Sequence, residues 1–338
     1  MWITYSGHEL RRNQAKLGRR RKQQPLPVRD GLNPSRARVT GTGPVKALDF
    51  LRAVVEGQRH RHPADDDAAI ARRFMDGQVV DGRGRTLTGA ENLEPGTDVW
   101  FYRMPAPETP VPGDLRRIYE DDRILVVHKP PFLATTPKGR HITQTVTTIL
   151  RRSLSDPQLS PVHRLDRLTE GLLILAKHEQ YRGAYQRLFE ARTVEKRYKA
   201  LAPFDAAVAS NLPTTISNRI VKNVGTLQAH VEDGESNATT AVHGIKPVCA
   251  QHSGQEVGEY DLRPATGKTH QLRLHMAQLG IAICNDPLYP TVTTGADEPD
   301  DYNSPLRLCC TELSFADPIS GTPVKFETTP SWRDRCYR

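Results

Sequence analysis

The segment HRLDRLTEGLLILAK (residues 163–177) places one carboxylate, Asp166, between Arg164 and Arg167, just ahead of an apolar run. The five apolar residues LLILA are too few for a helix of ordinary length and are typical of a strand buried on both faces. The pattern therefore predicts that Asp166 lies on the loop that enters a buried strand. For an isolated aspartate beside two arginines, a surface salt bridge is the ordinary interpretation, so other segments must decide.

A second segment, TVEKRYKALA (193–202), alternates between more apolar and charged positions. The period of two predicts a strand that carries Lys196 and Tyr198 on its more apolar face. It follows the stretch HEQYRGAYQRLFEAR (178–192), whose apolar residues recur at helical spacing. Taken alone, this pattern predicts that Tyr198 is a core residue.

A third segment, ATGKTHQLRLHMAQLG (265–280), predicts a glycine turn and a helix that begins near Thr269. His270 and Arg273 are three residues apart and share a helix face, so Arg273 is expected to point outward beside a histidine. His270 and His275 are five apart and miss the i, i+4 spacing of a zinc-binding helix. No metal site is predicted.

These three segments, in this order and at these separations, resemble the RluA-type pseudouridine synthases. The stretch YEDDRILVVHKPPFL (119–133) is similar to the first motif of that family, and the resemblance covers roughly residues 112 to 328. It implies an α+β fold, the pseudouridine synthase fold, with a mixed, largely antiparallel central sheet. It also implies isomerisation of uridine to pseudouridine in structured RNA, without cofactor or metal.

The resemblance assigns roles to individual residues. Asp166 becomes the catalytic carboxylate at C1′ of the ribose, acting as nucleophile or as base. Tyr198 becomes the residue that stacks on the target uracil and is thought to move the proton from C5. Arg273 becomes the partner of the aspartate, because a close arginine favours the charged carboxylate. Arg164 belongs to the loop that enters the RNA stack when the base turns out.

Local charge agrees with an RNA partner. Residues 138–199 hold thirteen Lys and Arg against six Asp and Glu, and a basic cleft can hold phosphates. About half of the arginines there are expected to contact RNA. Those considered for the cleft are Arg140, Arg151, Arg152, Arg164, Arg187 and Arg192. The predicted RNA-binding residues are Arg164, Arg167, Arg140, Lys196, Lys268 and His270.

Three positions depart from the family pattern. Lys268 stands where the family usually has arginine, which keeps the charge and loses the bidentate fork. Glu170 replaces a small hydroxyl residue and brings a negative charge near Asp166, which favours a raised pKa of that carboxyl. In CND (284–286) an asparagine replaces the commoner glycine. None of these changes removes Asp166, Tyr198 or Arg273.

The rest of the chain divides at proline-rich stretches. Residues 1–40 hold ten Lys and Arg against two acidic residues, which predicts a basic, disordered arm and a linker over 25–39. The arm either tracks phosphates or is a solvated segment without a function. Residues 105–114, PAPETPVPGD, are predicted as a linker, and residues 115–330 as the catalytic domain.

Residues 41–104 are predicted as an S4-like RNA-binding domain. VKALDFLRAVV (45–55) and DDDAAIARRFMDG (65–77) show helical spacing, and two alternating runs then predict a small hairpin. The second helix carries the basic pair Arg72–Arg73. Any small α+β domain would show the same layout.

The amino-acid composition limits which classes of protein remain possible. No apolar window of about 18 residues exists, so no membrane span is predicted, and five cysteines without CxxC spacing predict free thiols in the cytoplasm. The leading hypothesis is a monomeric cytoplasmic enzyme acting on ribosomal RNA, with transfer RNA as the alternative. A non-catalytic RNA-binding or ribosome-assembly protein with the same fold and a paired-carboxylate glycosidase are the other classes. The basic cleft and the low aromatic content of 6% weaken the glycosidase.

Overall fold

The structure is a computed structural model that describes residues 24–248, 256–295 and 297–333. The chain forms two compact units, Met1–Ala106 and Pro107–Arg338. The boundary between them falls inside the predicted linker 105–114. None of the described helices is both long and apolar enough to cross a membrane. The predicted arm over residues 1–23 lies outside the described residues.

The first unit packs two helices against short strands. Its elements are β1 (Ser35–Arg38), β2 (Val45–Lys46), α2 (Ala47–Glu56), α3 (Asp67–Met75), β3 (Val79–Asp81), β4 (Asn92–Leu93) and β5 (Asp98–Phe101). The strands form a β1–β5–β3 sheet and a β2–β4 pair. Asp66 caps α3 by accepting a hydrogen bond from the Ala69 N–H at 2.9 Å. Leu51, Val55 and Ile70 from the helices share a core with Val99 and Phe101 of β5.

One prediction about this unit is wrong. The linker predicted for 25–39 contains β1, which pairs antiparallel with β5 along its whole length. A four-residue strand next to prolines gives no local signal, and its hydrogen bonds come from a strand about sixty residues later. The basic pair does lie on the second helix, but its two members differ in exposure: Arg73 is buried and forms an ion pair with buried Asp65 at 2.7 Å. Only Arg72 of the two is exposed.

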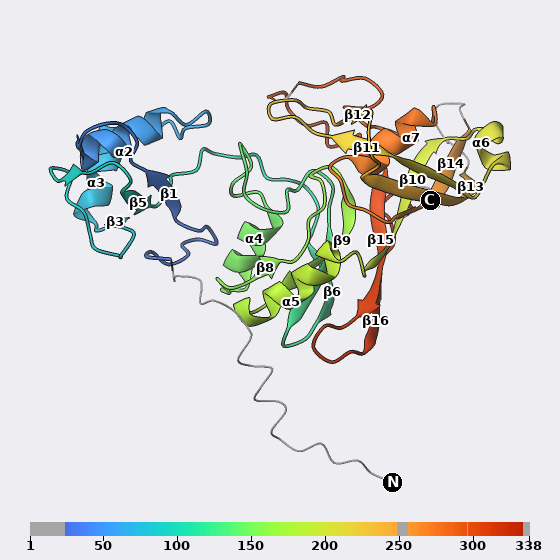
Figure 1. Cartoon of the computed structure of the whole chain (residues 1–338), viewed down its shortest axis with the longest axis horizontal. Coiled ribbons are helices and arrows are strands. Elements are labelled where there is room, and N and C mark those ends of the chain that lie inside the picture. The colour runs from blue at the N-terminus through green and yellow to red at the C-terminus, as the bar shows by residue number, and fades with distance from the viewer. Residues whose placement is uncertain (1–23, 249–255, 296, 334–338) are drawn as a thin grey trace, which may run out of the picture. The chain divides into compact units, whose positions relative to one another are not determined.

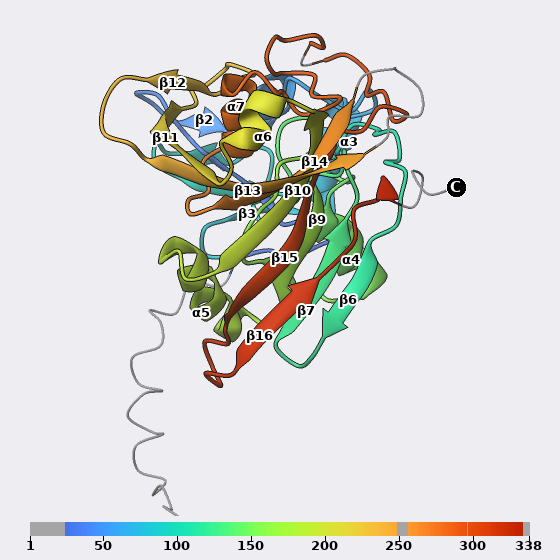
Figure 2. The same ribbon diagram turned by 90° about the vertical axis from the view of Figure 1, so that its right-hand side faces the viewer.

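The second unit is built on one long curved sheet (Figures 1 and 2). Its strand order is β12-β11-β13-β14-β10-β15-β9-β7-β6, with β16 beside β15 and β8 beside β9. Every pairing is antiparallel except that of β15 with β9. The sheet is therefore mixed and largely antiparallel, as the resemblance predicted.

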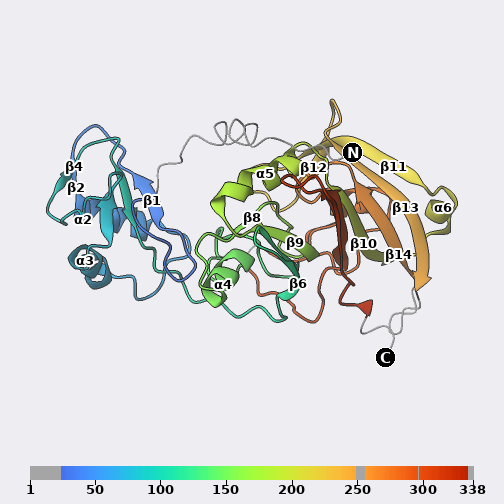
Figure 3. The same ribbon diagram turned by 90° about the horizontal axis from the view of Figure 1, so that it is seen from below.

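The bounds of these elements are as follows. The strands are β6 (Arg116–Glu120), β7 (Ile124–Lys129), β8 (Ser160–Pro161), β9 (Glu170–Ala176), β10 (Glu195–Pro203), β11 (Thr214–Val221), β12 (His230–Glu232), β13 (Ala238–Val248), β14 (Val257–Pro264), β15 (Leu308–Ala316) and β16 (Pro323–Glu327). The helices are α4 (Val146–Ser153), α5 (Glu179–Glu190), α6 (Ala206–Ser210) and α7 (Gln271–Gln278). Helices α4 and α5 lie near β8 and β9, whereas α6 lies beside β11 and β13 (Figure 3).

Strand β9 is buried on both faces, which confirms the prediction made from LLILA. Leu172 and Ile174 pack into one core with Tyr185 of α5. Leu173 and Leu175 pack into a separate core on the opposite face, together with residues of α4. Alternate side chains of a strand point to opposite faces, so a continuous apolar run fills both cores at once.

Gly171 sits where β9 meets β15. Its φ is +114°, and a Cβ atom built there would overlap the backbone of Cys310. Only glycine tolerates both the conformation and this close approach. The parallel contact between β9 and β15 thus fixes the start of β9 at Glu170, four residues after Asp166. This contact therefore sets the position of the loop that carries Asp166.

Candidate active site

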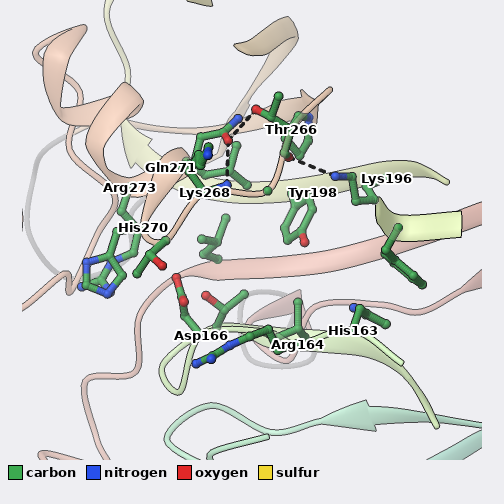
Figure 4. Close-up of a pocket in the computed structure, with 18 of the residues that line it drawn as sticks. His163, Arg164, Asp166, Lys196, Tyr198, Thr266, Lys268, His270, Gln271 and Arg273 are labelled. Atoms are coloured by element: carbon green, nitrogen blue, oxygen red, sulfur yellow. Dashed lines mark hydrogen bonds between the residues drawn. The ribbon is translucent and has the colours of Figure 1, made fainter. Parts of the chain in front are cut away.

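A cavity of about 380 Å³ opens beside the loop that enters β9. Most of its walls come from three stretches that are distant in sequence: the loop 163–169, the stretch 189–198 from the end of α5 into β10, and the turn 264–273 that leads into α7. Leu308 at the start of β15 completes the lining. Figure 4 shows Asp166 and Arg164 on one side of the cavity, with Tyr198 and Lys196 facing them from β10. The structure thus brings the three predicted segments together.

Asp166 is half-buried on the loop before β9, as predicted. The loop is held by Lys129, which is fully buried and donates from Nζ to the carbonyl oxygens of Pro130, Leu133 and Arg167 at 2.9, 2.8 and 3.0 Å. Burial lowers the pKa of Lys129 to about 7, although the negative charges of Glu170 and then Asp166 act in the opposite direction. The ammonium group therefore joins the end of β7 to the residue after Asp166.

Tyr198 lies on β10 opposite Asp166 and lines the cavity. Burial, followed by the nearby thiol of Cys310, raises the pKa of Tyr198 well above its usual value. The side chain is therefore a neutral phenol at physiological pH. Lys196, two residues earlier on the same face, donates to the carbonyl of Thr266 at 3.0 Å, and burial lowers its pKa. The predicted alternation of β10 is confirmed, since Arg197 on the other face pairs with Asp261.

Arg273 lines the cavity but does not point outward from α7 as expected. It is 2% exposed and forms a bidentate ion pair with Asp286, whose side chain is fully buried, at 2.7 and 2.5 Å. The expected partner was Asp166. Burial alone would lower the pKa of Arg273, but the bonds and charge of Asp286, together with the charge of Asp166, raise it. Asp166 thus lies within the electrostatic reach of Arg273 while Asp286 holds the guanidinium.

The segment around Asp286 also explains one departure from the family pattern. Asn285 has a φ of +60°, in the left-handed region that favours glycine. Asparagine is one of the few other residues that adopt this conformation readily. Its backbone turn lets Asp286 also accept hydrogen bonds from the Leu288 and Tyr289 N–H groups at 2.9 and 3.1 Å.

The predicted RNA-binding residues separate into two groups. Arg164, Lys196, Lys268 and His270 line the cavity. Arg167 does not: it makes a bidentate ion pair with Asp300 at 2.6 and 2.8 Å, so its guanidinium is already occupied. Arg140 donates to the carbonyl of Glu298 at 3.2 Å in the same acidic loop. The contacts of Arg167 and Arg140 join residues more than 130 positions apart, so no local sequence pattern could predict them.

The arginines considered for the basic cleft also separate into groups. Of the six arginines considered for it, Arg164 and Arg192 line the cavity. Arg151 is turned inward instead and donates to the carbonyl of Leu159 at 2.7 Å. The net charge of a stretch predicts its basicity but not which face each side chain takes.

Glu170, the second departure, lies at the start of β9 and is buried. Its Oε1 accepts a hydrogen bond from the Ser331 N–H at 3.0 Å, and its Oε2 lies 3.6 Å from Nε2 of His128. Ser331 is far along the chain, so the carboxylate helps to attach the C-terminal segment to the sheet. Its role in the structure is therefore one of packing against that segment.

Two further residues of the site were missed by the sequence analysis. The ring of His163 stacks on Phe189 with centroids 4.2 Å apart, and its Nε2 accepts a hydrogen bond from the Ile174 N–H at 3.0 Å. Burial lowers the pKa of His163 to about 3. Gln271 accepts from the Lys268 N–H at 3.1 Å and donates to the carbonyl of Thr239, which shapes the 264–273 turn. The signal available in the sequence was that His163 belongs to the HRLD motif and Gln271 to the HQLR segment.

Comparison with known proteins agrees with this geometry. The family described as RNA pseudouridylate synthase matches residues 123–278. The chain is 31% identical over 231 residues to ribosomal large subunit pseudouridine synthase D of Neisseria meningitidis, covering 64% of this chain and 59% of that protein. It is 32% identical over 208 residues to the dual-specificity RNA pseudouridine synthase RluA of Vibrio parahaemolyticus, covering 60% of this chain and 78% of that protein.

Among solved structures, human RNA pseudouridylate synthase domain containing 1 matches with a TM-score of 0.52 and 25% identity. That match covers 66% of this chain and 86% of the human chain. The chain belongs to the RluA-type family of RNA pseudouridine synthases. It spans less than two thirds of the length of the Neisseria relative.

Proposed function

We propose that this protein isomerises uridine to pseudouridine in RNA, with Asp166 as the catalytic carboxylate. The observation that carries the proposal is the convergence of Asp166, Tyr198 and Arg273 on one cavity of about 380 Å³. That volume falls in the range of small-ligand sites, about 300–1,000 Å³. A half-buried carboxylate faces a neutral aromatic ring across this space. This arrangement suits a nucleoside, whose sugar would lie against the carboxylate and whose base would lie against the ring.

The chemistry needs one bond broken and one formed at the same sugar carbon. The N1–C1′ bond of uridine breaks, the base turns, and a C5–C1′ bond forms, while the proton on C5 leaves and N1 gains one. Asp166 is the group placed to act at the sugar, either by attacking C1′ or by removing a proton next to it. The charge of Asp166 acts on Arg273 across the same cavity.

Tyr198 supports the base. Its raised pKa keeps the phenol neutral, which suits stacking and hydrogen bonding through the hydroxyl. Stacking of a base on an aromatic side chain is worth about 1–3 kcal/mol. That gain offsets the cost of a few kcal/mol for turning a base out of an RNA stack. Arg164 is exposed and lines the cavity, which supports a contact with the RNA around the vacated position.

We propose ribosomal RNA as the substrate and the cytoplasm as the compartment. The similarity to the ribosomal large subunit enzyme of Neisseria supports the first. The first unit supports it as well: two helices on a small sheet, with exposed Arg72 on the second helix, suit an S4-like module that binds structured RNA. The free thiols of Cys284, Cys309 and Cys310 suit a reducing compartment.

A transcript-wide pseudouridine map tests this proposal. RNA from cells with and without the gene is treated with carbodiimide, and the adducts are read as reverse-transcription stops. We expect ribosomal sites to disappear without the gene and to return with the wild-type protein but not with Asp166→Ala. Loss confined to transfer RNA would keep the reaction and overturn the substrate. An unchanged map would overturn the function.

A further inference from the structure

We propose that His270 recognises the 2′-hydroxyl of the target nucleotide by accepting a hydrogen bond at Nε2. This inference rests on the proposed function and deepens it, because it names the group that would let the site select ribose. Nothing in the family match assigns a role to this side chain. The argument uses the backbone of His270, the tautomer of its ring, its protonation and its place in the cavity.

The backbone holds the ring in place. His270 is the residue that precedes α7, and its φ of +59° lies in the left-handed region, which is uncommon for a histidine. Such conformations cluster at functional sites, where the surrounding structure compensates their cost. The ring packs edge-on against Tyr289, with centroids 5.7 Å apart and an interplanar angle of 87°. The imidazole therefore has one fixed orientation.

The hydrogen bonds of Tyr289 determine the tautomer. Its hydroxyl accepts from the Ala229 N–H at 2.6 Å and donates its single proton to the Ala229 carbonyl at 2.9 Å. Nδ1 of His270 lies 3.1 Å from the same oxygen. A tyrosine hydroxyl has one proton, so the arrangement that supplies a proton to each of the three contacts is the one in which Nδ1 donates. The neutral ring then carries a lone pair on Nε2.

The ring is neutral at physiological pH. Burial lowers the pKa of His270 to about 4; the negative charges of Asp166 and Asp286 oppose this shift, and the positive charges of Arg273 and Lys222 add to it. Nε2 has no hydrogen-bond partner among the described residues. It is thus an acceptor ready for a donor from outside the chain.

The position of the ring indicates which donor that is. His270 lines the cavity next to Asp166, whereas Tyr198 lies on the far side of Asp166 from it (Figure 4). If Asp166 acts at C1′ and Tyr198 stacks on the uracil, His270 faces the sugar on the side away from the base. The hydrogen-bond donor nearest C1′ on the sugar is the 2′-hydroxyl, the group that distinguishes RNA from DNA.

A synthetic RNA stem-loop that copies a site found by the pseudouridine map provides the test. One version carries uridine at the target and another carries 2′-fluorouridine, which cannot donate a hydrogen bond. Its fluorine also withdraws electrons more strongly than a hydroxyl group and slows cleavage of the N1–C1′ bond in every variant alike. We compare kcat/KM for wild type and His270→Gly, because glycine adopts the left-handed conformation without strain. His230→Ala, at a histidine outside the cavity, is the control.

We expect the preference for uridine over 2′-fluorouridine to be about 5- to 150-fold larger in wild type and His230→Ala than in His270→Gly, the effect of leaving a buried acceptor unpaired. The preference that remains in His270→Gly is the effect of the fluorine on the bond that breaks. Equal ratios in all three proteins, or no preference in wild type, would overturn the inference. No pseudouridine in the unmodified stem-loop with wild type would instead overturn the proposed function.

The tautomer has a separate readout that needs no substrate. In ¹⁵N-labelled protein, long-range ¹⁵N–¹H spectra distinguish the two ring nitrogens of each histidine. We expect the His270 ring, assigned from its loss in His270→Gly, to carry its proton on Nδ1 and to remain neutral down to pH 5. A proton on Nε2, or titration near the ordinary value of about 6.5, would contradict the inference even if the protein is active.

Discussion

Replacing Asp286 by alanine should strongly destabilise the second unit. The carboxylate is fully buried and makes two hydrogen bonds to Arg273, which is 2% exposed, and two more to backbone N–H groups. Asp286→Ala leaves a buried guanidinium without its partner. Breaking a buried ion pair in this way costs about 3–5 kcal/mol.

The expected change can be measured by calorimetry. For a unit of this size each kcal/mol lowers the melting temperature by about 2–4 °C, so the transition of the second unit should fall by about 6–20 °C. Asp301→Ala is the matched control, since Asp301 is an exposed carboxylate of the same segment whose side chain accepts from the Asn303 N–H at 3.0 Å. It should leave the transition unchanged.

A fall of less than about 2 °C for Asp286→Ala, under 1 kcal/mol, would refute this reasoning. It would mean that Arg273 finds another partner at little cost, and Asp166 is the carboxylate of the cavity whose charge already acts on it. In that case Asp286 and Asp166 would compete for one guanidinium. The pairing expected from the sequence would then be reached after a small rearrangement.

Three further outcomes are expected. Gly171→Ala should lower the free energy of unfolding by about 3 kcal/mol or more through overpacking, because the new Cβ meets the Cys310 backbone. Gly244→Ala is the control, since a Cβ there meets nothing within 4 Å, and it should keep the wild-type urea midpoint. Equal urea midpoints for the two variants would refute this. Asp300→Asn should release Arg167, so the slope of log affinity for RNA against log salt should steepen by about 1, and an unchanged slope would show that Arg167 does not reach phosphate. The free energy of unfolding should fall as the pH drops from about 6.5 towards 4, because histidines whose pKa is lowered in the fold gain protons when it unfolds. The loss is up to about 1.4 kcal/mol per pH unit for each such ring. The four histidines concerned are His141, His163, His270 and His275. Urea midpoints that stay constant from pH 7 to pH 5 would contradict this last expectation.

Features set by local sequence were predictable. The apolar run after Asp166 specified a strand buried on both faces, and the alternation around Tyr198 specified which face the tyrosine takes. Both patterns follow from the period-two geometry of a strand, which needs no knowledge of distant segments. The motif order then supplied the family and with it the mixed sheet.

Features set by distant partners were not predictable. The spacing of α7 placed His270 and Arg273 together, but burial of Arg273 depends on Asp286, which lies beyond the helix in an irregular segment. The ion pair of Arg167 with Asp300 joins positions 133 residues apart. Strand β1 likewise exists because β5 is available to pair with it. In each case the partner decides the structure, and the local pattern does not name the partner.

The most direct test of the account is proton release from C5 by the purified protein. RNA labelled with [5-³H]uridine and containing the site found by the pseudouridine map is mixed with excess protein, and tritium in water is followed over time. Wild type should release one tritium per target site. Asp166→Asn should bind the RNA with equal affinity and release tritium at least about 1,000-fold more slowly, as expected when a central catalytic group is removed. Release by Asp166→Asn at the wild-type rate would contradict the central claim that Asp166 performs the chemistry.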